Sequence, residues 1–191
     1  NAVDVSTNIY DEKQINQLLA EKKISHAEFN LLMFKLKKDW RSFFIEAINI
    51  YKNIAVSGKT GSGKTTFTRS LIDLIPIDER IVTIEDVHEL KLERHINKTH
   101  LMYGKGAGRV SSAELLAAGM RLSPDRLLLA ELRHDETWDY IQSLNTGHPG
   151  SITSTHANNA NQTFDRIAGL LLQSPNGAKM PYQALIKTVR S

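Results

Sequence analysis

The N-terminal quarter of the chain has apolar positions at helical spacing. Residues 1–10 are polar and aperiodic, and residues 11–23 carry a short helical pattern. A second helical pattern begins where Ser25 is followed by Glu28, the spacing of a capping box. Its apolar positions are Phe29, Leu32, Met33, Leu36, Trp40, Phe43, Phe44, Ala47 and Ile48. We interpret this aromatic stripe as packing against one face of a sheet, with an adenine pocket as the alternative.

Beyond Asn53 the pattern changes to short apolar runs that alternate with helical segments. Residues 54–56 form an apolar run that ends at Gly58, and residues 64–75 read as a helix that ends before Pro76. Further strands are expected at 81–84, 126–130 and 151–155. Helices are expected at 112–122, 135–145, 161–173 and from Pro181, and a charged connection precedes residue 112. Strands that alternate with helices predict an α/β fold with a mostly parallel sheet covered by helices on both faces.

Composition excludes several classes of protein. The 191 residues are 41% hydrophobic and 24% charged, which is typical of a globular domain. The absence of cysteine excludes thiolate chemistry and fits a reducing compartment such as the cytoplasm. The longest apolar runs are far below the ~20 residues of a membrane span, and we see no signal peptide. The net charge is +3, and the basic residues are scattered along the chain. We interpret the cluster of Lys35, Lys37 and Lys38 as a solvated helix face. Nucleic-acid or anionic-lipid contact is an alternative that the sequence does not indicate.

Residues 58–65 form a phosphate-binding motif. They match the phosphate-loop pattern G-x-x-x-x-G-K-[ST] between an expected strand and an expected helix. Glycines let backbone N–H groups surround a phosphate, and the helix N-terminus adds partial positive charge. Lys64 would reach the β- and γ-phosphates of ATP, and the Thr65 hydroxyl would bind Mg²⁺. The expected nucleotide-binding residues are Gly58, Thr60, Gly61, Ser62, Gly63, Lys64, Thr65 and Thr66.

Two expected strands deliver carboxylates to the same crevice. Glu85 and Asp86 follow the strand at 81–84, and Glu131 follows the strand at 126–130. The carboxyl ends of parallel strands face the crevice that holds the glycine loop. One acid there can hold Mg²⁺ through water and another can orient the attacking water, although a single glutamate after a strand is equally often an N-cap or surface residue.

Two histidines flank the expected strand at 151–155. His148 and His156 lie in the stretch 146–158. A neutral imidazole there can hydrogen-bond a phosphate oxygen and so respond to the presence of the γ-phosphate. A metal site is disfavoured because no third soft ligand is nearby. The other histidines, His26, His88, His95, His100 and His134, read as surface or packing residues.

These elements in this order resemble the secretion ATPase superfamily, which includes type II secretion and type IV pilus motors and type IV secretion ATPases. The matching blocks are the loop with its flank 53–57, residues 81–90 (similar to the family's Asp box), residues 123–133 (similar to its Walker B strand) and residues 146–158 (similar to its His box). The sequence of residues 155–158 and the lack of cysteines resemble the type IV secretion branch more than the other branches.

The resemblance implies a RecA-like P-loop NTPase that hydrolyses Mg-ATP. It also implies roles for individual residues: Glu85 would activate water, Glu131 would support Mg²⁺ together with Thr65, and His156 would sense the γ-phosphate. Arg121 and Arg133 match arginines near the family's site, with less definite roles.

The resemblance implies a hexamer with ATP between subunits, other secretion-system ATPases and inner-membrane components as partners, and a peripheral place at the cytoplasmic face of the bacterial inner membrane. For domain organisation it suggests that residues 1–24 are a linker or arm to an N-terminal domain outside this chain. Residues 25–191 would be the RecA-like ATPase domain without its last strands. We therefore expect weak ATPase activity, or none, from this segment alone.

Three other functions stay open on the sequence. A pilus assembly or retraction motor is disfavoured only by the sequence features that distinguish the branches of the superfamily. A module that binds nucleotide and drives assembly without turnover would share the phosphate loop. A small-molecule kinase is the weakest alternative, because there is no acceptor-binding insertion and the Asp and His boxes would go unexplained.

Overall fold

The structure is a computed structural model that describes residues 9–104, 110–134, 136–145 and 147–190. The chain divides into two compact units, Asn1–Lys52 and Asn53–Ser191. The division falls after Lys52, whereas the sequence suggested a boundary after residue 24. The assignment of residues 1–24 to an arm stays a prediction.

The described part of the first unit, residues 9–52, contains three helices, α1 (Glu12–Ala20), α2 (His26–Leu36) and α3 (Trp40–Asn49). The predicted capping box at the start of α2 is confirmed, since the Ser25 hydroxyl and the Glu28 side chain each accept a bond from the other residue's backbone N–H. Helices α1 and α2 share a small core made of Ile15, Ile24 and Leu32.

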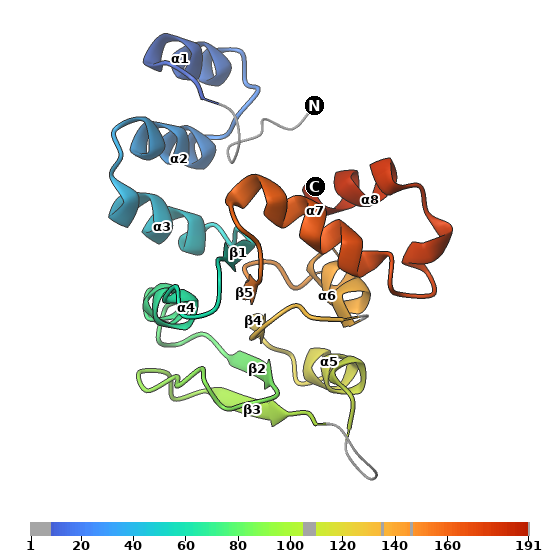
Figure 1. Ribbon diagram of the computed structural model, residues 1–191. Helices are drawn as coiled ribbons and strands as arrows, with labels where there is room; N and C mark the ends of the chain where they lie inside the picture. The colour runs from blue at the N-terminus through green and yellow to red at the C-terminus, as the bar shows by residue number, and fades with distance from the viewer. Residues whose placement is uncertain (1–8, 105–109, 135, 146, 191) are drawn as a thin grey trace. The chain divides into compact units, whose positions relative to one another are not determined.

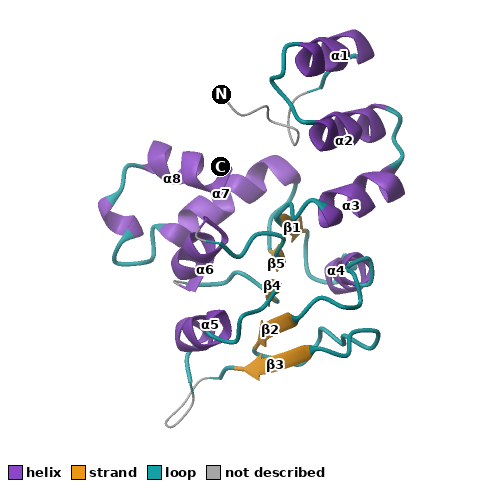
Figure 2. Ribbon diagram, turned by 180° about the vertical axis from the view of Figure 1, so that it is seen from behind, coloured by secondary structure: helices purple, strands orange, loops and turns teal. Residues whose placement is uncertain are grey.

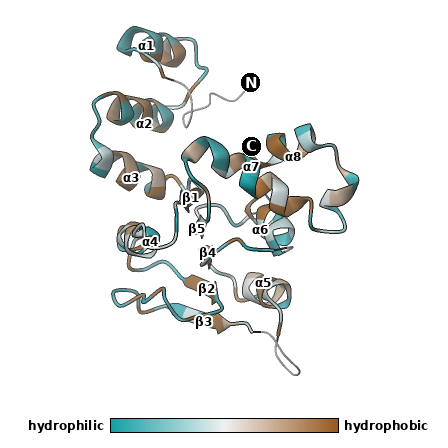
Figure 3. Ribbon diagram, in the orientation of Figure 1, coloured by the Kyte–Doolittle hydropathy of each residue, from teal (hydrophilic) through white to brown (hydrophobic). Residues whose placement is uncertain are grey.

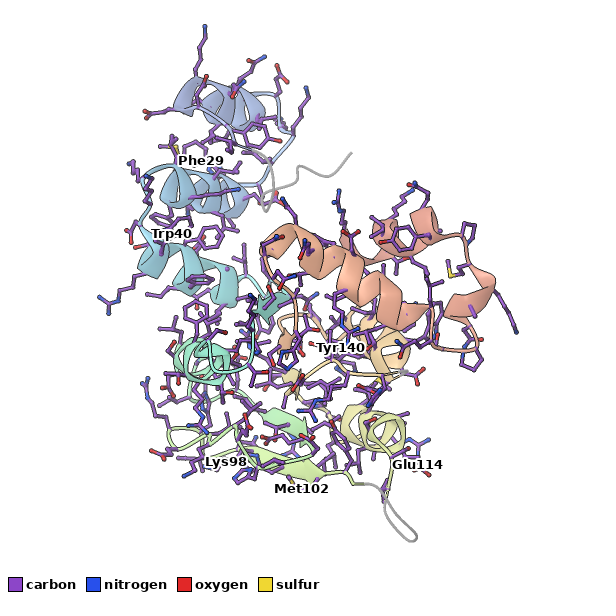
Figure 4. All side chains as sticks on the ribbon, viewed as in Figure 1. Phe29, Trp40, Lys98, Met102, Glu114 and Tyr140 are labelled. Atoms are coloured by element: carbon purple, nitrogen blue, oxygen red, sulfur yellow. The ribbon has the colours of Figure 1, made fainter. Side chains whose placement is uncertain are left out.

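The single helix expected over residues 25–48 is wrong, because the chain breaks it into α2 and α3. Lys38 has a positive φ of 56°, which a helix does not tolerate, and the Asp39 carboxylate then caps the new helix by accepting from the Ser42 N–H at 3.2 Å. The aromatic stripe divides with it. Phe29, labelled in Figure 4, packs on the small core, whereas Trp40 is 50% exposed. Coverage of a sheet face by this stripe stays a prediction.

The described residues of the second unit form five parallel strands. These are β1 (Ile54–Ser57), β2 (Ile81–Glu85), β3 (Lys98–Met102), β4 (Arg126–Leu129) and β5 (Ile152–Thr155). One ladder has the order β3-β2-β4 and the other pairs β1 with β5. The ladders meet at a parallel bridge between Glu131 and Ser154. All the carboxyl ends of the strands therefore point the same way.

Helices cover both faces of these strands, as predicted. They are α4 (Lys64–Ile72), α5 (Ser112–Met120), α6 (Glu136–Asn145), α7 (Ala160–Leu171) and α8 (Tyr182–Arg190), with a short 3₁₀ turn at Gly177–Lys179. Helix α4 lies on one side of the strands, and α5 and α6 lie on the other (Figure 1). The view from behind shows the same division (Figure 2).

The core of the second unit explains why β2 and β4 are so apolar. Every residue of both strands is buried, and Figure 3 colours β2 mainly hydrophobic. Val82, Ile84, Leu127 and Leu129 join the inner faces of α5, α6, α7 and α8 in one cluster. A strand that is buried on both sides holds the residues after its carboxyl end in a fixed place.

Strand β3 was not predicted, because residues 98–102 were taken for part of a charged connection. It is an edge strand that begins with three polar residues and ends with two apolar ones, and Lys98 and Met102 lie at its two ends (Figure 4). Partial exposure leaves it without the apolar signal of a central strand. The predicted helix and strand ends otherwise agree to within a few residues. Asp135 and Thr146, which fall within predicted segments, lie outside the described residues.

No helix in the described ranges is both long and apolar enough to cross a bilayer.

Candidate nucleotide-binding site

The phosphate loop leaves β1 and enters α4 where the sequence predicted it. Gly61 and Gly63 have φ values of +76° and +86°, a region that side chains with a Cβ rarely adopt. A Cβ at Gly58 would lie 2.5 Å from the Ser62 Oγ, so this glycine is required by the tightness of the loop. The loop therefore has the shape that a phosphate cradle needs.

Lys64 is the first residue of α4, and its side chain folds back over the loop. Its Nζ donates to the carbonyl oxygens of Gly58 at 2.9 Å and Lys59 at 3.0 Å. The same Nζ lies 3.4 Å from His156 Nδ1 at the end of β5. The ammonium group is thus held between the loop and the His box by contacts that a phosphate oxygen can replace.

Thr65 contacts a carboxylate that the sequence analysis did not single out. Its Oγ1 donates to Glu89 Oε2 at 3.0 Å, and Arg69 Nε donates to the backbone oxygen of Glu89 at 2.8 Å. Glu89 lies four residues beyond the end of β2, in a segment that turns back toward α4. The available signal was the resemblance of residues 81–90 to the Asp box, which contains Glu89 in addition to Glu85 and Asp86.

A chain of charges crosses the carboxyl ends of β2, β4 and β5. Arg133 donates through Nη1 to Asp86 and through Nη2 to Glu131 Oε2, the latter at 2.6 Å. The other oxygen of Glu131 lies 3.0 Å from His156 Nε2. A neutral imidazole that carries its proton on Nε2 satisfies both Glu131 and the ammonium of Lys64.

These contacts fix the charge of Arg133. The hydrogen bond to Glu131, together with the charges of Glu131 and Asp86, raises the pKa of Arg133 further above its ordinary value. The guanidinium therefore stays protonated and donates charge-assisted hydrogen bonds to both carboxylates. Nearby, burial and the charges of Asp86 and Glu136 raise the pKa of Tyr103 to about 12, so its phenol is neutral at physiological pH.

The loop and the strand ends line one cleft of about 340 Å³. Of the predicted residues, the cleft brings together Thr60, Gly61, Lys64, Thr65, Asp86, Glu131, Arg133 and His156. Glu89 and the buried Thr68 line it as well. Gly58, Ser62, Gly63 and Thr66 belong to the loop or to the start of α4 without lining the cleft. Arg121 and His148 do not line it either.

Glu85 is fully buried and does not line the cleft. Its Oε2 accepts from the backbone N–H groups of Glu89 at 2.8 Å and Leu90 at 2.7 Å. Its Oε1 accepts from the Thr83 hydroxyl at 2.8 Å. In this geometry Glu85 holds the segment that carries Glu89. Its predicted role as the water-activating acid stays a prediction.

The donor set fits Mg²⁺ and a nucleoside triphosphate. The hydroxyl of Thr65 and the carboxylates of Glu89 and Glu131 are oxygen ligands of the kind that a hard divalent cation prefers. The loop, Lys64 and the N-terminus of α4 suit phosphate oxygens. A parallel α/β sheet with this loop after its first strand defines a P-loop nucleotide-binding domain.

Comparison with known proteins places the domain in a family. Residues 17–186 match the family described as "Type II/IV secretion system protein", and the chain belongs to it. Type IV secretion system protein VirB11 of Brucella abortus is 43% identical over 169 residues, which are 86% of this chain and 47% of that protein. Type IV secretion system protein PtlH of Bordetella pertussis is 45% identical over 156 residues, 80% of this chain and 46% of that protein.

Solved structures agree with this assignment. The VirB11 ATPase of the Brucella suis type IV secretion system, in complex with sulphate, matches with a TM-score of 0.83 and 38% identity, over 96% of this chain and 57% of that one. The pilus retraction motor PilT with bound ADP matches with a TM-score of 0.56 and 32% identity, over 66% of this chain and 38% of that one. The fold is therefore that of the RecA-like secretion ATPases. The chain spans about half the length of the curated relatives that it matches.

Proposed function

We propose that the protein hydrolyses Mg-ATP to power translocation or pilus assembly in a bacterial type IV secretion system. The observation that carries the proposal is the meeting of Lys64, Thr65, Glu131 and His156 in one cleft beside a phosphate loop. The assignment to a type IV secretion system rests on the relatives, because VirB11 and PtlH are both named as type IV secretion system proteins.

Thr65 and Glu131 would hold Mg²⁺, directly or through water, and the ion would neutralise charge on the terminal phosphates. Lys64 would leave the loop carbonyls for the β- and γ-phosphate oxygens. His156, whose Nδ1 already lies 3.4 Å from Lys64 Nζ, would change partner in the same step and so sense the γ-phosphate. Its link to Glu131 passes that change to β4.

For the attacking water, Glu89 is the better-placed acid. Its carboxylate lines the cleft and contacts Thr65, the residue proposed for Mg²⁺. Glu85 is buried beneath it with both oxygens engaged by the protein. We therefore assign water orientation to Glu89 and support of the Glu89 segment to Glu85.

The site also explains the expectation of a ring. Arg133 is the predicted arginine that lines this cleft, and its guanidinium is bound to Asp86 and Glu131. Phosphoryl transfer gains about 10³–10⁵ in rate from an arginine that stabilises the transition state. A homo-hexamer could supply that arginine from a neighbouring subunit or from a further domain, with other secretion ATPases and inner-membrane components as partners at the cytoplasmic face of the inner membrane.

The test compares ATP hydrolysis per subunit for this 191-residue chain and for a polypeptide extended at its N-terminus to the length of its relatives. The proposal predicts that the longer protein turns over ATP faster and that its rate per subunit rises with concentration as it assembles. Equal rates at all concentrations would contradict the need for a ring. ATP binding without turnover in the longer protein would favour the second candidate, a nucleotide-dependent assembly module, which the engaged state of Arg133 supports.

A further inference from the structure

A second cluster of donor side chains lies behind the nucleotide cleft. Glu85 and His88 bracket the end of β2, and His100 lies on the neighbouring strand β3. The register of the two strands pairs Thr83 with His100, and Glu85 follows Thr83 on the same face of the sheet. The fold thus brings together residues that are 15 positions apart in the sequence and that the sequence analysis treated separately.

The three side chains lie close enough together to share one metal ion. Both His88 Nδ1 and His100 Nδ1 lie 3.4 Å from Glu85 Oε1, and all three ligand atoms lie within 4.8 Å of one another. A tetrahedral Zn²⁺ with ligands at ~2.0–2.2 Å separates its ligand atoms by ~3.4 Å. Two of the three separations therefore already have the length of a tetrahedral edge.

The surroundings orient these ligands in advance. The Thr83 hydroxyl donates to Glu85 Oε1 at 2.8 Å and lies 2.8 Å from His100 Nδ1, and two backbone N–H groups donate to Oε2, so these contacts restrain both the carboxylate and His100. Hydrogen bonds that fix a ligand in this way are the usual support of metal sites. The His88 side chain is 47% exposed and that of His100 is 23% exposed, which leaves a path for an ion and a water as fourth ligand.

We propose that Glu85, His88 and His100 bind a borderline transition-metal ion of the Zn²⁺ class, separate from the Mg²⁺ expected at Thr65. Two imidazoles and one carboxylate are the ligand types that such an ion selects over Mg²⁺. Because Glu85 Oε2 accepts from the N–H groups of Glu89 and Leu90, the bound ion stiffens the segment that carries Glu89. The metal site itself does not depend on the proposed ATPase function, and only its influence on Glu89 bears on that function.

The experiment titrates the nucleotide-free chain with Zn²⁺ by calorimetry and with Co²⁺ by visible absorption, which reports tetrahedral coordination. The parent chain is compared with His88→Ala and His100→Ala. His26→Ala controls for an exposed histidine outside the cluster, and His156→Ala controls for metal binding in the nucleotide cleft. Circular dichroism checks that each variant is folded, and His88, being half exposed, is the substitution that disturbs packing least.

Loss of one of three ligands is expected to weaken Zn²⁺ binding by about 100-fold or more, since second-shell losses alone cost 10–100-fold. The two control variants keep the parent affinity for this site. In the parent, Zn²⁺ also slows hydrogen exchange at the Glu89 and Leu90 amides, and in His88→Ala it does not. Equal affinity in the parent and in folded His88→Ala and His100→Ala, or a loss that follows His156 instead, would overturn the proposal. Loss of ATP hydrolysis has no part in this test, so failure of the metal site and failure of the proposed function are distinguishable.

Discussion

The division of labour between Glu85 and Glu89 makes a sharp prediction for two matched substitutions. Glu85→Gln and Glu89→Gln each remove one negative charge and keep the shape of the side chain. We expect the first to lower stability and the second to lower turnover, because the two carboxylates face different surroundings. Glu85 is buried against backbone donors, and Glu89 is exposed on the cleft.

The magnitudes follow from the contacts. In Glu85→Gln the remaining oxygen can still accept from the Glu89 and Leu90 amides, but both bonds lose their ionic character. A hydrogen bond to a charged group is worth roughly 1 kcal/mol more than a neutral one, so the free energy of unfolding falls by about 2 kcal/mol. For a chain of this size that is a drop in Tm of about 4–8 °C. Glu89→Gln removes one exposed contact and should change stability by no more than about 0.5 kcal/mol.

The assays are thermal unfolding of the 191-residue chain in a chelating buffer, and ATP turnover of the extended polypeptide well below its Tm. Glu89→Gln should keep ATP affinity and lose about 10²–10⁴ in turnover, the usual weight of a residue that positions or deprotonates the nucleophile. Glu85→Gln should stay within about tenfold of the parent rate. A large loss of turnover in Glu85→Gln beside normal turnover in Glu89→Gln would refute this reasoning and restore Glu85 as the water-activating acid.

Two further substitutions test Glu131 in the cleft and the ion pair of Glu79 with the buried Arg126. Glu131→Gln should keep ATP binding and lower turnover of the extended polypeptide by about 10²–10⁴, because it weakens the contacts to both Arg133 and His156; parental turnover would show that Glu131 is structural. Glu79→Ala should lower the free energy of unfolding by about 3–5 kcal/mol, measured by urea denaturation, because it leaves the fully buried Arg126 without its carboxylate partner at 2.5 Å; a change below about 1 kcal/mol would show that the pair is not needed.

Much of the fold could be predicted because its signals are local. The phosphate loop has a fixed sequence pattern, and the buried strands β2 and β4 each contain a short run of apolar residues. Strand β3 escaped prediction because an edge strand with polar residues lacks that run. The site was predicted only in part. Glu89 and the cluster of Glu85, His88 and His100 depend on how the segment after β2 turns back and on the register of β3, and neither is written in any short pattern.

Calorimetric titration with Mg-ATP directly tests whether residues 58–66 bind Mg-ATP through Lys64. The parent chain is compared with Lys64→Ala and with Lys59→Ala, which removes a lysine side chain from the same loop that does not line the cleft. We expect Lys64→Ala to weaken ATP binding by about 100-fold or more, since hydrogen bonds to charged groups are worth ~1.5–3 kcal/mol each and Lys64 can make two. Lys59→Ala should stay within about tenfold of the parent, because an exposed charge outside the cleft is worth at most ~1 kcal/mol. Equal ATP affinity in the parent and in folded Lys64→Ala would contradict the assignment of the site.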